Sequence, residues 1–145
     1  MLDELEALYR SRLPEFRRVA AAIAGDRELG SDAVQEAFAS AVRKRRSFRG
    51  SGTLEAWVWR IVVNKARDAR RRRRPALAGA PHVNLPDISL DGLTARQREI
   101  VFLHYYADLD YAEIAQALRI SPGTVGATLN AARRTLRTTL EEVRT

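Results

Sequence analysis

The stretch that decides the fold occupies residues 94–140 and reads TARQREIVFLHYYADLDYAEIAQALRISPGTVGATLNAARRTLRTTL. Residues 94–97 (TARQ) have the form of a capping box, and residues 110–113 (DYAE) repeat it, so a helix should begin at each. A third start lies at Ser121, whose hydroxyl can cap a helix, followed by Pro122, which suits the first helical position. The stretch therefore predicts three helices joined by short turns.

The last of these helices has one apolar stripe. Apolar residues recur at steps of four, three, four and four, at Val125, Leu129, Ala132, Leu136 and Leu140, which predicts about five turns of helix with one buried side. Only residues 119–121 separate it from the short helix before it, so the two helices should cross steeply. This arrangement is typical of a helix-turn-helix that places its second helix in DNA. A three-helix bundle that binds no DNA is the alternative.

The positive charge of the chain is concentrated in its middle. Residues 41–75 carry 13 basic and two acidic side chains, a net charge of +11, although the whole chain has a net charge of only +7. Such a concentration favours a polyanion partner, above all a nucleic acid. A solvated surface run or a membrane-surface patch would have the same composition.

Several function classes are not expected. The chain has no cysteine, which excludes disulfides and Cys-based zinc sites. No acidic and histidine cluster has metal-ligand spacing, and no phosphate-binding loop is present. The longest uncharged apolar run, residues 19–24, is too short to span a bilayer, and no signal peptide is recognisable. We expect a cytoplasmic protein that is no enzyme and has no cofactor or metal.

The first half of the chain also predicts three helices. Residues 2–24 form the first, Ser31 caps the second, and Thr53 caps the third, which ends before Pro75. A basic, glycine-containing loop at residues 43–52 separates the second helix from the third.

A linker divides the chain. Residues 75–89 contain prolines and small residues without helical periodicity, which indicates a flexible linker. We therefore expect an all-α fold of two small helical domains, at residues 1–74 and 90–145.

Aromatic residues lie among the cations of the third helix. Rings can stack on bases while cations follow the phosphates, a combination that suits single-stranded nucleic acid. We expect Trp57 in the core. Trp59 should lie on the flank of the helix, and for Trp59 and Phe48 both a core position and a base-stacking position stay open.

Three parts of the sequence resemble one family, the extracytoplasmic-function (ECF) sigma factors of the bacterial sigma-70 family. They are DAVQEAF at 32–38; FR at 48–49 with LEAWVWRIVVNKARD at 54–68; and LTARQRE at 93–99 with YAEIA at 111–115 and SPGTV at 121–125. The resemblance implies a sigma factor that binds RNA polymerase core and directs promoter recognition, DNA opening and transcription initiation.

The resemblance also implies a task for each domain. Residues 1–74 correspond to sigma region 2, which binds the clamp helices of the largest polymerase subunit and the −10 element. Residues 90–145 correspond to region 4, which reads the −35 element. The polymerase contacts fall on Asp32, Gln35 and Glu36. The single-strand contacts fall on Phe48, Arg49, Trp59, Arg60, Asn64, Lys65, Arg67 and Arg71. The −35 contacts fall on Ser121, Thr124, Thr128, Asn130, Arg133, Arg134 and Arg137.

Some residues depart from the family pattern. Arg119 stands where the family usually has glycine, Val42 where it commonly has tryptophan, and the last helix is basic only from Arg133. Base readout by that helix therefore looks sparse, and phosphate contacts and DNA shape should contribute more. Two alternatives stay open: a stand-alone helix-turn-helix regulator, and a degenerate sigma-like protein that binds polymerase without initiating. An anti-sigma protein is a further candidate partner.

Overall fold

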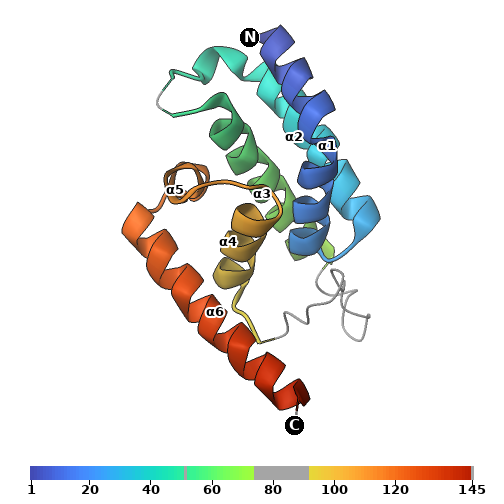
Figure 1. Ribbon diagram of the computed structural model, residues 1–145. Helices are drawn as coiled ribbons and strands as arrows, with labels where there is room; N and C mark the ends of the chain where they lie inside the picture. The colour runs from blue at the N-terminus through green and yellow to red at the C-terminus, as the bar shows by residue number, and fades with distance from the viewer. Residues whose placement is uncertain (51, 74–91, 145) are drawn as a thin grey trace.

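The computed structural model of the chain describes residues 1–50, 52–73 and 92–144. This part of the chain is all-helical, as predicted, and contains no strand. Its elements are α1 (Leu2–Ala24), α2 (Arg27–Arg43), the short 3-10 helix η1 (Arg45–Ser47), α3 (Leu54–Arg73), α4 (Ala95–Tyr105), α5 (Tyr111–Leu118) and α6 (Pro122–Arg144) (Figure 1). The predicted linker, residues 75–89, lies outside the described residues.

Helices α1, α2 and α3 pack around a cluster of rings. Phe16 of α1 lies 5.2 Å from Phe38 of α2 and 4.2 Å from Trp59 of α3, measured between ring centroids. Trp59 is fully buried, which is one of the two positions left open for it. The expectation for Trp57 was wrong, because Trp57 is only partly buried and packs at the edge of the core. The buried stripe of α3 continues through alanines that the pattern does not distinguish from surface residues. It consists of Val58, Trp59, Val62, Val63, Ala66 and Ala69.

The start of α2 also differs from the prediction. Ser31 is not the cap; α2 begins directly after Asp26, whose Oδ2 accepts a hydrogen bond from the Leu29 N–H at 2.9 Å. Gly30, which comes before the predicted cap, therefore lies inside the helix. A Cβ at Gly30 would come within 2.5 Å of the Ala21 backbone, so this glycine permits the close approach of α1 and α2.

The predicted caps of the second half are confirmed. Thr94 Oγ1 accepts from the Gln97 N–H at 3.1 Å, while the Gln97 side chain accepts from the Thr94 N–H at 3.0 Å. Asp110 forms the same reciprocal box with Glu113. Ser121 Oγ accepts from the third N–H that follows it, at 3.0 Å. These local bonds fix where α4, α5 and α6 begin.

The turn between α5 and α6 has a left-handed residue. Arg119 adopts φ 58° and ψ 47° at the end of α5, a conformation that favours glycine. The Arg119 side chain is exposed, and its Cβ makes this backbone conformation cost about 1 kcal/mol more than glycine would. Beyond the turn, Val125, Leu129 and Ala132 of α6 are buried where α6 packs against α4 and α5.

The two halves of the chain touch. Helix α4 packs against α1, and α5 packs against α3 (Figure 1). Arg12 of α1 donates to the Ala107 carbonyl after α4 and pairs with Glu55 of α3, at 3.1 Å between Nε and Oε1. The Thr53 N–H donates to the Gln116 side chain of α5 at 3.4 Å. We call these contacts the closed arrangement.

No helix within the described ranges is both long enough and apolar enough to cross a bilayer.

Candidate polymerase and DNA surfaces

The three predicted polymerase contacts lie together on α2. Asp32, Gln35 and Glu36 are exposed, and their spacing of three and four residues puts them on one face of the helix. Gln35 Nε2 donates to the Tyr9 hydroxyl of α1 at 2.7 Å, which holds its side chain over the α1–α2 seam. The face is therefore a polar surface with two exposed carboxylates.

An apolar groove adjoins this polar face. It has a volume of about 470 Å³ between α1 and α2, and Gln35 forms part of its wall. Leu2 and Val42, both on its lining, are 48% and 38% exposed. The sequence analysis missed this groove because its residues come from two helices whose crossing is a tertiary feature. The signal was Val42, in the position where the family commonly has tryptophan.

One face of α3 combines an aromatic ring, an amide and a cation. Trp57, Asn64 and Arg71 recur at steps of seven residues, two helical turns, and so share a face; Asn64 and Arg71 are exposed. Phe48 lies against Trp57, with 5.4 Å between ring centroids. We call this set the α3 strand face. Trp57 was not among the predicted site residues, although the step of seven could have indicated it, whereas Trp59 lies in the core.

The predicted cations of α3 fall into two groups. Arg49, in the loop before α3, and Arg71 are exposed, and Arg71 pairs with its neighbour Asp68. Lys65 is partly buried. Arg60 and Arg67, in contrast, face the second half of the molecule.

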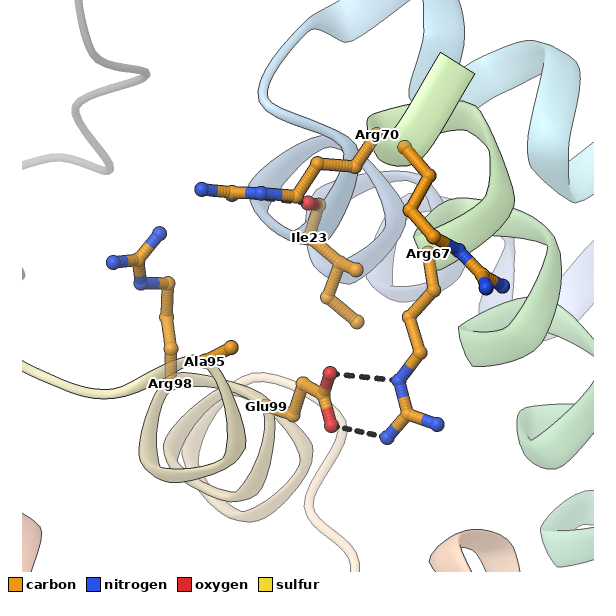
Figure 2. Close-up of a pocket in the computed structure, with 7 residues that line it drawn as sticks. Ile23, Arg67, Arg70, Ala95, Arg98 and Glu99 are labelled. Carbon is orange, nitrogen blue, oxygen red and sulfur yellow. Dashed lines mark hydrogen bonds and ion pairs between the residues drawn. The ribbon is translucent and has the colours of Figure 1, made fainter. Parts of the chain in front are cut away.

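The closed arrangement binds Arg67 and brings Arg60 near the cation Arg119. Arg67 makes a double hydrogen bond with buried Glu99 of α4, with 2.8 Å between Nε and Oε1 (Figure 2). This bond raises the pKa of Arg67. Burial lowers the pKa of Arg60, and the nearby cation Arg119 lowers it further. Both guanidinium groups remain charged at neutral pH.

The exposed side of α6 is neutral near its start and basic farther on. Thr124 and Asn130 are exposed and Thr128 is partly buried, while Ser121 caps the helix. The first exposed cation of α6 is Arg134. Arg137 follows it and is exposed as well.

Arg133 is held by α4. Its Nε donates to the Tyr105 hydroxyl at 2.9 Å, and its guanidinium carbon lies 5.9 Å from the centre of the Tyr105 ring. The side chain thus reaches along the protein surface toward α4. Gly126, between Thr124 and Thr128 in the sequence, leaves room for Tyr111, because a Cβ there would lie 3.3 Å from the tyrosine ring.

Within the described residues, no group of three or more His, Asp or Glu side chains is placed to hold a metal ion.

Comparison with known families covers both halves of the chain. Residues 8–76 match the family described as Sigma-70 region 2, and residues 89–136 match Sigma-70, region 4. The ECF RNA polymerase sigma factor SigL of Mycobacterium tuberculosis is 28% identical over 96% of this chain and 90% of SigL. The ECF sigma factor EcfG of Rhodopseudomonas palustris is 27% identical over 92% of this chain and 83% of EcfG.

Two solved structures share the fold. One is the sigma factor RpoE of Bartonella quintana in complex with the anti-sigma factor NepR, with a TM-score of 0.76, 24% identity, and coverage of 95% of this chain and 97% of that one. The other is CnrH in complex with the cytosolic domain of CnrY, with a TM-score of 0.78, 22% identity, and coverage of 98% and 90%. From the two matched regions and these relatives, the chain belongs to the ECF branch of the sigma-70 family, the RNA polymerase sigma factors that direct transcription initiation.

Proposed function

We propose that α2 binds the clamp helices of the largest subunit of RNA polymerase core through Asp32, Gln35 and Glu36. The three side chains are exposed on one face, beside the apolar groove that includes Val42. An apolar centre with a polar rim is typical of protein interfaces. The groove would take an apolar side chain of the partner while the carboxylates bind its cations.

The α3 strand face would bind the non-template strand of the −10 element. The presence of rings, an amide and a cation on this one face is the main support for the proposal. The Phe48–Trp57 pair offers rings for an unstacked base, Asn64 offers an amide for a base edge, and Arg71 offers a charge for a phosphate. Arg49 extends the cationic track along the preceding loop. Trp59 supports α3 from the core and has no assigned base.

Helix α6 would read the −35 element. Thr124, Thr128 and Asn130 present small polar groups on its first turns, where they can reach base edges in a major groove. Arg134 and Arg137 follow and would contact phosphates. Arg133, which is bound to Tyr105, would reach DNA only after leaving that hydroxyl.

Promoter binding would require the closed arrangement to open. Arg60 and Arg67 belong to the predicted single-strand set, yet Arg67 is bonded to Glu99 and Arg60 lies near the cation Arg119. A strand laid along the whole of α3 therefore needs α4 and α5 to move away. Polymerase, by binding the two regions at separate places, would favour the open state.

An anti-sigma protein would be the natural partner of the closed arrangement. Two proteins that share this fold are each bound to a partner. RpoE is in complex with the anti-sigma factor NepR, and CnrH is in complex with the cytosolic domain of CnrY. We place the protein in the cytoplasm, where polymerase core and promoter DNA are found.

Reconstituted transcription tests the proposal. Purified protein and polymerase core, with fragmented genomic DNA, should yield mapped start sites preceded by a shared motif. On one such promoter, Asn64→Ala should reduce permanganate-detected opening about tenfold, because it removes a base contact worth roughly 1–3 kcal/mol, while duplex binding stays unchanged. The exposed Arg18→Ala serves as control.

The polymerase surface has its own measurement. Asp32→Ala with Glu36→Ala should weaken co-elution with core, whereas Glu4→Ala, an exposed carboxylate on α1, should not. Binding to core without any start site would favour the degenerate sigma-like alternative. Tight duplex binding without core, and no co-elution, would favour a stand-alone regulator and contradict the proposal.

A further inference from the structure

A cluster of three rings lies at the turn between α4 and α5, beside α6. The His104 ring packs against Tyr105, with 4.9 Å between ring centroids, and against Tyr111, with 5.7 Å. His104 Nδ1 lies 3.1 Å from the Leu109 carbonyl, a bond that holds the histidine ring in place. Tyr105 is the exposed member of the cluster, since 52% of its surface is accessible.

The exposed tyrosine holds one cation of α6. Arg133 Nε donates to the Tyr105 hydroxyl at 2.9 Å, and the guanidinium carbon lies 5.9 Å from the ring centre, within the range of a cation–π contact. The hydrogen bond to Tyr105 raises the pKa of Arg133, burial lowers it, and Tyr111 adds to the increase. A hydrogen bond and a ring contact therefore both keep the Arg133 side chain against α4.

Arg133 is one of few cations that α6 can offer to DNA. Residues 122–138 contain three basic side chains, Arg133, Arg134 and Arg137. Arg134 and Arg137 are exposed, whereas Arg133 is partly buried. Each phosphate that a basic side chain neutralises adds to the affinity for a duplex. Holding one of three cations along the protein surface therefore lowers the affinity that α6 can reach.

A tyrosine hydroxyl is a partner that DNA can displace. The hydroxyl is neutral and accepts a single bond from Nε, whereas a phosphate is charged and can accept two parallel bonds from one guanidinium group. A phosphate is therefore the stronger partner for Arg133. The exchange still requires the bond to the hydroxyl to break, and the observed affinity falls with the fraction of molecules in which Arg133 is not yet free.

We propose that Tyr105 is a positioning residue that holds Arg133 away from DNA and thereby sets the affinity of α6 for duplex phosphates. Without DNA, Arg133 stays on the hydroxyl; when a duplex lies along α6, Arg133 exchanges the hydroxyl for a phosphate. The restraint weakens binding to any duplex, so binding depends more on polymerase holding α6 close to the promoter. This inference rests on the proposed binding of α6 to duplex DNA, whereas the bond between Tyr105 and Arg133 does not.

Tyr105→Phe tests the proposal, because it removes the hydroxyl and keeps the ring. Fluorescence anisotropy of the full chain with a labelled duplex of mixed sequence measures the effect, since phosphate contacts carry no sequence information. We expect Tyr105→Phe to bind about fivefold more tightly than the wild-type protein, the scale of one hydrogen bond that no longer has to break. The double variant with Arg133→Ala should bind no more tightly than Arg133→Ala alone.

The dependence on salt identifies the contact that is gained. Adding Arg133→Ala to Tyr105→Phe should reduce the log–log salt slope by about 0.9, the value for one phosphate of duplex DNA. Tyr106→Phe is the matched control: it removes a hydroxyl from the next residue, whose ring packs on Phe102, and it should leave the duplex affinity unchanged. Circular dichroism melting shows that each variant is folded.

Three results would overturn the proposal. The first is equal duplex affinity of Tyr105→Phe and the wild-type protein, or no binding by either, which would show that the bond does not limit DNA binding. The second is weaker binding by Tyr105→Phe, which would show that the hydroxyl contacts DNA or directs Arg133 toward it. The third is a gain that persists when Arg133→Ala is added, which would assign the effect to another group.

Mapping of start sites with core separates this inference from the proposed function. If start sites are found and Tyr105→Phe binds the duplex like the wild-type protein, only the role of Tyr105 fails. If Tyr105→Phe gains affinity through Arg133 but no start site is found, the restraint stands and the promoter assignment fails.

Discussion

The two halves of this sigma factor acquire their structure in different ways. In the second half, α4, α5 and α6 each begin at a side-chain cap, at Thr94, Asp110 and Ser121, so the local sequence specifies the helix starts. In the first half, a ring cluster and a close helix crossing at Gly30 decide which residues are inside. Charge differs too, since the exposed cations gather on α3 and not on the first turns of α6.

This contrast shows that two properties of a helix have different causes: the residue at which it begins, and the side that it buries. Where a helix begins is a local matter of hydrogen bonds to its first N–H groups. Which side of a helix is buried depends on what packs against it, and α3 contacts α1, α2 and α5. The first half should therefore respond most to changes of packing, and the contact between halves to changes of charge.

The tryptophan pair offers the largest effect. Trp59→Ala removes a fully buried ring that stacks on Phe16, so the free energy of unfolding should fall by about 3–5 kcal/mol. Trp57→Ala, on the α3 strand face, should lose much less stability but impair promoter opening. Urea denaturation compares the two variants. A greater loss of stability in Trp57→Ala would contradict the assignment of core and surface.

The crossing of α1 and α2 can be broken at a single glycine. Gly30→Ala places a Cβ 2.5 Å from the Ala21 backbone, so the helices must separate, with a loss of about 1–3 kcal/mol. Gly123→Ala is the matched control, since its Cβ would meet nothing nearer than 3.8 Å, and a helix prefers alanine. Thermal melting should show a lower Tm only for the first variant. Equal melting temperatures would mean that the crossing is looser than described.

The ion pair between the halves should contribute less. A double-mutant cycle with Arg67→Ala and Glu99→Ala should give a coupling of about 1–2 kcal/mol, because Glu99 is buried while the Arg67 side chain is 32% exposed and partly screened. Small-angle X-ray scattering should show a larger radius of gyration for Arg67→Ala. The cycle with Arg10 and Glu6, an exposed pair on α1, is the control. A radius unchanged by Arg67→Ala would show that apolar packing alone keeps the halves together.

The smallest effect is a dependence of stability on pH that comes from Glu55 of α3, the partner of Arg12. Burial raises the pKa of Glu55, while the adjacent Arg12 acts in the opposite direction. The folded chain therefore binds this proton more tightly than the unfolded chain. The resulting stabilisation is complete below the ordinary value of 4.5 and is lost as pH rises through the raised value.

Glu55→Gln should remove this loss. Its free energy of unfolding should decline less steeply than that of the wild-type protein as pH rises from 4.5 toward neutral. Urea midpoints across that range measure the slopes, and Glu4→Gln, an exposed carboxylate, should keep the wild-type slope. Parallel profiles for wild type and Glu55→Gln would show that Glu55 ionises alike in the folded and unfolded chain.

Much of the architecture was predictable. The helices of the second half, the cap at Thr53 and the exposed face with Asp32, Gln35 and Glu36 all follow from local spacing and hydrogen-bonding chemistry. The start of α2 was not predictable, because glycine is typical of turns and only the close packing of α1 explains a glycine inside α2 at position 30. The α3 strand face was found only in part, since Trp57 and Trp59 differ by two residues and the neighbours decide which one faces inward.

The sequence by itself determined the helices, the family and the location of the charge, because caps, periodicity and net charge are properties of neighbouring residues. Only the tertiary structure decided that Trp59 is core, that Arg67 meets Glu99, and that Gly30 lies against the Ala21 backbone. Each of these joins residues that are far apart in the chain. Such contacts depend on how helices cross, which no local pattern encodes.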